Sequence, residues 1–148
     1  MTHTPRGYCI EDLEIGMSAS YGKTITEADV ILYAGISGDD NPIHIDEEYA
    51  RGTRFQGRVV HGMLLAGLIS CVAGTRLPGP GAIYMGQTLR FCSPVRIGET
   101  VRVMATVTGV DRERRRVALA TRCLVGDRLV ADGEGLFLVE FRAQAAAA

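Results

Sequence analysis

The chain has 148 residues, of which 47% are hydrophobic and 22% are charged, and its formal net charge at pH 7 is −1. This length and composition predict one globular domain, residues 1–148, and exclude an intrinsically disordered chain. A charge so close to zero gives no electrostatic reason to bind nucleic acid or an anionic membrane. The sequence shows neither the apolar segment of a signal peptide nor about 18 consecutive apolar residues for a membrane span, so we expect a cytoplasmic protein.

The first half of the sequence predicts one strand and several helical segments around a polar turn. Residues 18–25 have the pattern of a strand, and residues 26–29 read Thr-Glu-Ala-Asp, a capping-box pattern that opens a helix ending near residue 36. A polar turn over residues 37–44 follows, and residues 46–51 are expected to form one or two further helical turns. We expect the polar loop over residues 52–58 to lie over the functional site.

The second half predicts a long helix and then a sheet. Residues 61–75 are apolar or small on nearly all sides, so we expect a helix that is buried on most of its surface and ends at the Pro- and Gly-rich run 77–81. The predicted strands that follow are 82–91, 100–110, 116–125 and 129–141. One long helix followed by four strands predicts an α+β fold, with an antiparallel β-sheet wrapped around a long central helix.

The cysteines and the C-terminus carry no signal of a bound group. Cys9, Cys71, Cys92 and Cys123 are widely separated, form no CxxC pair and do not cluster with histidine, so we expect reduced packing residues. The sequence also lacks a dinucleotide-binding glycine fingerprint, and we expect neither a metal nor another cofactor. The alanine-rich end, residues 143–148, is expected to be a frayed tail.

The polar turn holds the residue types that proton transfer requires. It reads Ser-Gly-Asp-Asp-Asn-Pro-Ile-His, so Asp39 and His44 are separated by a proline-containing bend that can fold both side chains toward one point. A carboxylate facing an imidazole is suited to hold one water and move its protons. Any one of these residues alone is more often a turn former or a surface residue, so the prediction depends on their combination.

The pattern Gly-Asp-x-Asn-Pro-x-His, with a second polar break at residues 59–65 that opens the apolar helix, resembles the (R)-specific enoyl-CoA hydratases. These enzymes form the MaoC-like branch of the hot-dog fold. The resemblance extends from residues 12–17 through residues 91–99 to the final strand. It implies a single hot-dog domain that forms a homodimer or a dimer of dimers, because dimerisation covers the sheet edges in this fold.

The resemblance also implies roles for individual residues. Asp39 and His44 would hold a single water and share the duties of base and acid, while Asn41 positions them. The backbone N–H of Gly62, at the start of the apolar helix, is the expected donor to the enolate oxygen, because the N–H groups of a first helical turn lack partners. We expect His61 to cap the helix or pack at its start instead of moving protons.

The expected substrate is a trans-2-enoyl thioester of CoA or acyl carrier protein. The enzyme would hydrate it to a (3R)-hydroxyacyl thioester or catalyse the reverse dehydration. Ser70 and Ala73 are small residues that leave room for an acyl chain longer than four carbons, and Arg76 and Arg90 are candidate contacts for the CoA phosphates.

Two other functions stay open at the level of sequence, because the hot-dog fold also serves acyl-CoA thioesterases and non-catalytic acyl-binding proteins. A thioesterase would typically carry a carboxylate on or near its central helix, and residues 64–72 contain none. A protein that only binds acyl groups would not need Asp39, Asn41 and His44 together.

Overall fold

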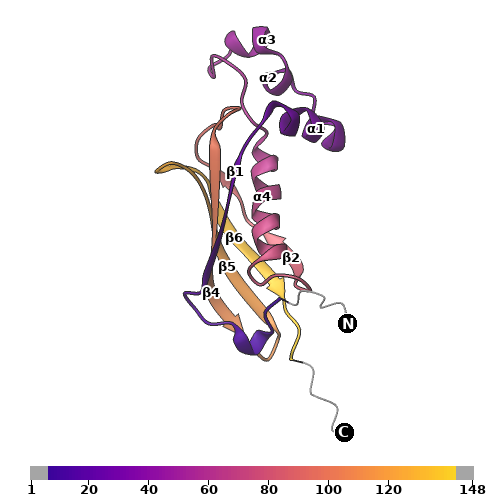
Figure 1. Cartoon of the computed structure of the whole chain (residues 1–148), viewed down its shortest axis with the longest axis vertical. Coiled ribbons are helices and arrows are strands. Elements are labelled where there is room, and N and C mark those ends of the chain that lie inside the picture. The colour runs from indigo at the N-terminus through magenta and orange to yellow at the C-terminus, as the bar shows by residue number, and fades with distance from the viewer. Residues whose placement is uncertain (1–6, 143–148) are drawn as a thin grey trace.

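The computed structural model describes residues 7–142. Within these residues the elements are, in chain order, η1 (Ile10–Asp12), β1 (Ser18–Thr24), α1 (Glu27–Ser37), α2 (Pro42–Ile45), α3 (Glu47–Arg51), α4 (Gly62–Thr75), β2 (Ile83–Gln87), β3 (Arg90–Phe91), β4 (Thr100–Asp111), β5 (Arg116–Val125) and β6 (Arg128–Leu138). Figure 1 labels all of them except η1 and β3. The helix α4 runs along one face of the sheet, and α1, α2 and α3 gather beyond one end of it.

The strands form one antiparallel sheet of six strands in the order β1-β4-β5-β6-β2, with the short β3 also paired to β6. The predicted single strand over residues 82–91 is therefore two strands. Between these two strands the backbone of Thr88 lies against Gly133 of β6, so closely that a Cβ on Gly133 would lie 1.8 Å from the Thr88 carbonyl oxygen. This close approach accompanies the interruption between β2 and β3. The remaining strand predictions are confirmed, although β6 ends at Leu138 instead of residue 141.

One face of α4 forms the centre of the hydrophobic core. Its buried residues pack with the inward-pointing residues of β4, β5 and β6, such as Val103, Leu119 and Phe137. Over residues 100–107 of β4 every second residue is buried in this core. The buried face of α4 consists of Leu64, Leu65, Leu68, Ile69, Val72 and Ala73.

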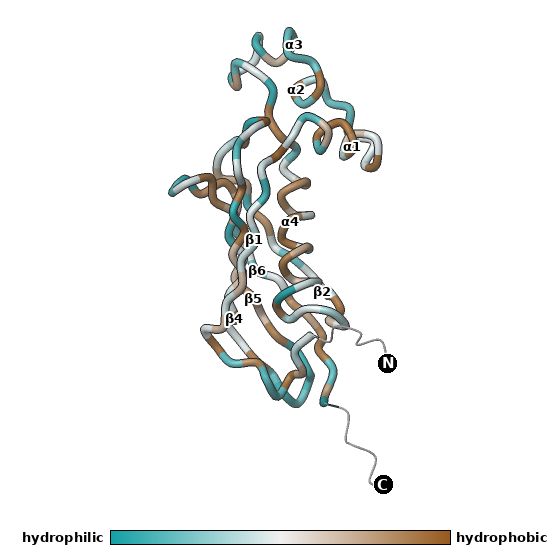
Figure 2. The backbone as a smooth tube through the Cα atoms, viewed as in Figure 1, coloured by the Kyte–Doolittle hydropathy of each residue, from teal (hydrophilic) through white to brown (hydrophobic). Residues whose placement is uncertain are grey.

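The opposite face of α4 is exposed in the single chain. Met63 is 56% exposed, and Gly67, Ser70 and Gly74 are exposed beside it. The prediction that α4 is buried on most of its surface is therefore wrong for this chain alone. Small residues make a helix look apolar all round without requiring burial, because they bring little side-chain surface to remove from water. In Figure 2 most of α4 is coloured as hydrophobic or near neutral.

The segments before α4 follow the predicted capping signals. Thr26 and Asp29 form the capping box at the start of α1, and Gly38 ends the helix in the left-handed conformation with φ 75°. The predicted helical turns over residues 46–51 are confirmed as α3. None of the helices within residues 7–142 is both long and apolar enough to cross a membrane. The tail predicted at residues 143–148 lies outside the described residues.

Candidate active site

The turn between α1 and α2 is built by local hydrogen bonds. After Gly38, the backbone N–H of Asn41 donates to the Asp39 carboxylate at 3.3 Å. The side chain of Asn41 caps α2 by accepting from the N–H of Ile43, also at 3.3 Å. Pro42 occupies the first turn, where its missing N–H costs nothing. Asn41 thereby fixes the start of the helical turn that carries His44.

The imidazole of His44 is held in one tautomer. His44 is only 7% exposed, and its Nδ1 lies 2.7 Å from the carbonyl oxygen of Val59. A carbonyl oxygen only accepts, so Nδ1 carries the hydrogen and Nε2 keeps a free lone pair. Burial lowers the pKa of His44 below its usual value, and nearby His61 adds to this, against the opposing effects of the Val59 hydrogen bond and the Asp39 charge. His44 is therefore a neutral proton acceptor at neutral pH.

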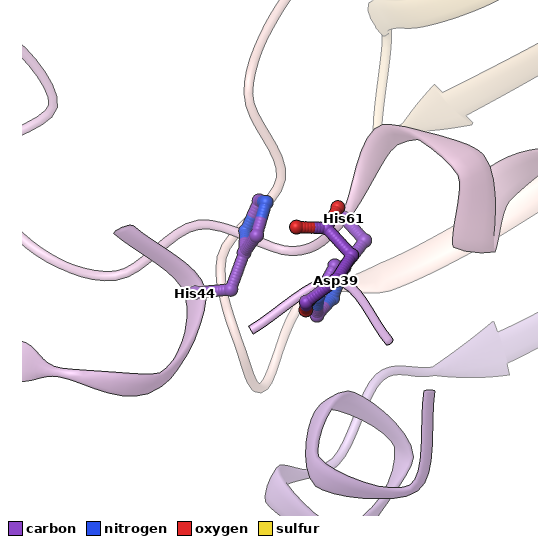
Figure 3. A group of neighbouring side chains, drawn as sticks. All are labelled: Asp39, His44 and His61. Atoms are coloured by element: carbon purple, nitrogen blue, oxygen red, sulfur yellow. The ribbon is translucent and has the colours of Figure 1, made fainter. Parts of the chain in front are cut away.

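Three polar side chains converge at this point (Figure 3). Asp39, His44 and His61 each bring one oxygen or nitrogen atom, and these atoms lie within 4.8 Å of one another. Because a hydrogen bond to an oxygen spans about 2.7–3.0 Å, a single water can lie between two such atoms. The predicted meeting of Asp39 and His44 is present in the structure.

The same three side chains are the one group of His, Cys, Asp and Glu residues in the described chain with spacing suited to a metal ion. The rings of His44 and His61, however, are stacked, with centroids 3.8 Å apart and planes inclined by 27°. Metal ligation uses the in-plane lone pairs of imidazole, and those of stacked rings run side by side instead of converging. This geometry suits a water between polar groups better than a tetrahedral ion.

A cavity of about 330 Å³ opens beside His44. Gly62 lines it as the first residue of α4, where no side chain caps the helix. The N–H groups of a first turn have no partner inside the helix, so this end of α4 favours a partial negative charge. Arg54 and Phe55 from the predicted covering loop line the cavity, and Phe91 closes another side.

Two arginines, Arg58 and Arg96, hold the loop over residues 52–58 in place beside the cavity. Neither was predicted from the sequence. Arg58 donates from Nε to the carbonyl oxygen of His44 at 2.6 Å, and its two terminal nitrogens bond both carboxylate oxygens of Glu27 at 3.1 and 2.9 Å. Arg96 donates to the carbonyl oxygens of Gly57 and Arg58 at 2.6 and 2.9 Å and also to that of Phe55. Backbone carbonyls are common to all residues, so these contacts left no signal in the sequence.

The four predicted substrate-binding residues do not meet at this cavity. Ser70 lies on the exposed face of α4, and Ala73 is buried in the core. Arg76 follows the far end of α4, where it bonds the carbonyl oxygen of Ser20, at about 20 Å from Gly62 given the rise of an α-helix. Arg90 is paired with Asp132 at 2.8 Å beside a separate hollow. Their role in substrate binding gains no support from the geometry and stays a prediction.

Comparison with known proteins assigns the chain to a protein family. A family model described as a MaoC-like domain matches residues 13–126. The chain belongs to the MaoC-like domain family. It is 52% identical over 132 residues to an (R)-specific enoyl-CoA hydratase of Rhodospirillum rubrum, covering 89% of this chain and 92% of that one. It is 51% identical over 135 residues to a 3-hydroxybutyryl-CoA dehydratase of Methylorubrum extorquens, covering 91% and 86%.

Solved structures agree with this assignment. R-hydratase PhaJ1 from Pseudomonas aeruginosa superimposes with a TM-score of 0.87 at 40% identity, covering 96% of this MaoC-like chain and 94% of that chain. The predicted hot-dog fold is confirmed by this likeness and by the antiparallel sheet around α4.

Proposed function

We propose that the protein is an (R)-specific enoyl-CoA hydratase, a hydro-lyase that adds water to a trans-2-enoyl thioester and catalyses the reverse dehydration. The observation that carries this proposal is His44, whose Nδ1 is held by the Val59 carbonyl so that Nε2 keeps a free lone pair. His44 lies beside the Asp39 carboxylate and lines the same cavity as Gly62. The similarity to hydratases and dehydratases over most of the chain supports the same reaction class.

The proposed chemistry uses one water held between Asp39 and His44. The water oxygen adds to Cβ of the enoyl group as one of its protons moves to the pair, and the pair delivers a proton to Cα. Because the two groups interact, they titrate and act as a pair. Negative charge that develops on the thioester oxygen is stabilised by the N–H of Gly62. Both new bonds form on one face of the double bond. The (3R) configuration depends on which face is presented to the water, and we propose it from the similarity to an (R)-specific enoyl-CoA hydratase.

The acyl chain has apolar surface available beyond the site. An open hollow of about 590 Å³ lies between α4 and β2, lined by residues such as Met63, Ala66 and Met85. Phe91 lines both this hollow and the cavity at His44, so the two spaces meet at its ring. We propose that a chain longer than four carbons extends past Phe91 into the hollow. We propose CoA as the thioester carrier, with acyl carrier protein as the alternative. Measuring turnover of the same enoyl group on each carrier would distinguish the two.

We also propose that two copies of the chain associate. Strand β2 ends the sheet and is paired only to β6 among the described strands, while Ile83 and Met85 on it are exposed. The exposed face of α4 lies close by, across the hollow. An unpaired strand edge next to exposed apolar side chains is a surface that soluble proteins cover. Light scattering should give a dimer or a dimer of dimers, and a fully active monomer at micromolar concentration would contradict this.

The function is tested by incubating the protein with crotonyl-CoA and octenoyl-CoA and following the enoyl absorbance. We expect the double bond to be lost while the thioester stays intact, and chiral analysis should find the 3R product. Thioester cleavage would instead indicate a thioesterase, and binding without turnover would indicate a non-catalytic protein.

Two conservative variants test the proton-moving pair. Asp39→Asn and His44→Gln keep shape and hydrogen bonding, and each should lower kcat by about 10²–10⁴-fold. The double variant should be about as slow as the slower single variant, because either change alone leaves the water without activation. A fully active Asp39→Asn protein would overturn the assignment.

A further inference from the structure

His61 makes contacts that neither helix capping nor simple packing explains. The sequence predicts that it caps α4 or packs at its start, and it packs there without forming a side-chain cap. The residue is 1% exposed, and its ring is stacked on His44 and tilted against Tyr33 at 4.9 Å. Its Nε2 lies 2.9 Å from the backbone carbonyl oxygen of Asp39. His61 thus touches both members of the proposed pair.

The hydrogen bond of His61 identifies the ring nitrogen that carries a hydrogen. The Asp39 carbonyl oxygen only accepts, so Nε2 of His61 carries a hydrogen. The other nitrogen, Nδ1, is buried and has no partner among the described residues. His61 therefore makes one side-chain hydrogen bond, donated by Nε2–H to the Asp39 carbonyl oxygen.

The surroundings of the stacked rings contain few other ionisable groups. Asp39 approaches from the turn before α2, and Tyr33 approaches from α1. Arg58 reaches the backbone of His44 while its charge is paired with Glu27. Tyr33 contacts His61 and Arg58 contacts the backbone of His44, whereas His61 contacts both the backbone of Asp39 and the ring of His44.

We propose that His61 is a positioning residue for hydration, which fixes the Asp39 carbonyl through Nε2–H and supports the face of the His44 ring. The two contacts together keep the carboxylate and the imidazole at the separation that one water can bridge. This inference rests on the proposed function, since it assigns to His61 the alignment of that same pair. A histidine that only filled space would need neither a polar edge aimed at a carbonyl nor a defined tautomer.

The two contacts can be removed separately. His61→Phe keeps a flat ring against His44 but removes the donor to Asp39, whereas His61→Gln keeps a donor and removes the ring. Because a misplacement of about 1 Å can cost roughly 10²-fold in rate, each variant should lower kcat by about 10–10²-fold with KM changed less than threefold. Tyr33→Phe keeps the ring beside His61 and serves as the matched control, with kcat expected to be unchanged.

The pH profile and NMR distinguish positioning from a structural role. His61→Gln opens one face of His44 to solvent, so the acid limb of kcat/KM should move to higher pH, and it should move less in His61→Phe, which keeps that face covered. Long-range ¹H–¹⁵N spectra, with the His44 signals assigned by His44→Gln, should show the Nδ1–H tautomer that Val59 sets in the unaltered protein. In His61→Gln the His44 signals should broaden and shift, because the ring loses the support of one face. Thermal unfolding of each variant measures how much folded protein contributes to each rate.

The outcomes separate the two proposals. A protein without hydratase activity would remove the proposed function, while the NMR experiment would still show whether His61 orders His44. Variants with unchanged kcat, pH profile and His44 signals would overturn the positioning role. A rate loss that matches only the loss of folded protein would also overturn it.

Discussion

Replacing Gly62 with alanine tests how closely the start of α4 is fitted to its surroundings. A Cβ at this position would lie 2.9 Å from Cε1 of Phe91 and 3.0 Å from its Cζ. An ordinary contact between carbons is about 3.5 Å or more, so the ring edge must retreat by about 0.6 Å. Phe91 is 50% exposed and lines both cavities, so the ring can move, but it moves into the space proposed for the thioester.

The two effects on stability nearly cancel. Alanine is favoured over glycine in a helix by up to about 1 kcal/mol. Overpacking costs about 1–3 kcal/mol in a tight core, and the lower end applies to a half-exposed ring. We therefore expect the free energy of unfolding of Gly62→Ala to change by no more than about 1 kcal/mol. The activity should fall much further, by about 10²-fold in kcat/KM with crotonyl-CoA, because the ring displaces the reacting group.

A second substitution makes the reasoning refutable. Phe91→Leu shortens the side chain that the new methyl group meets, so Gly62→Ala/Phe91→Leu should recover most of the activity lost in the single variant. Phe91→Leu alone is the matched control and should change crotonyl-CoA turnover only slightly. The steric account fails if Gly62→Ala is fully active, or if the double variant is no faster than Gly62→Ala in the enoyl absorbance assay.

Three further outcomes follow from the contacts around the site. Arg58→Lys loses the bond to the His44 carbonyl and the two-point contact with Glu27, so it should destabilise the fold by about 1 kcal/mol in urea unfolding, and Glu27→Gln should cost less. Burial lowers the pKa of His44 below its ordinary value, so the acid limb of kcat/KM should lie at lower pH than the titration of a free imidazole. The stability due to neutral His44 is complete above pH 6.5 and declines as the pH falls below it, a decline that His44→Gln should reduce. Burial raises the pKa of the Cys123 thiol to about 12, so Ellman's reagent at pH 8 should modify exposed Cys92 quickly and Cys123 only after unfolding.

The sequence predicted the fold because its signals are local and repeated. The capping box at Thr26 reports on neighbouring residues, and it is confirmed together with the helix that it opens and the strands predicted over residues 100–110 and 116–125. The extent of burial of α4 could not be predicted in the same way. Met63 and Ser70 face outward although the helix looks apolar all round, since composition does not state what covers each face.

The same distinction between local and distant signals applies to the candidate site. Asp39 and His44 are close in sequence, and their meeting could be predicted from one turn. The Val59 carbonyl that sets the His44 tautomer is 15 residues away and is a backbone group, which carries no sequence signal. The charge of Arg76 suggested a phosphate contact, and its guanidinium lies over the ring of Tyr21 far from the cavity, so this role gains no support from the geometry and stays a prediction.

The cavity wall that contains Phe91 comes from a different stretch of sequence than the proposed proton-moving residues. The carbonyl of buried Val95 accepts the N–H of Val60 at 2.8 Å, and the N–H of Cys92 donates to Val130 at 2.9 Å, so backbone bonds anchor this wall at both ends. The side chains at positions 91–93 can therefore be varied as a short cassette that contains none of the proposed proton-moving residues. A library of this kind, selected for turnover, would let acyl-chain preference be evolved with Asp39 and His44 unchanged, in a segment that takes a single mutagenic primer.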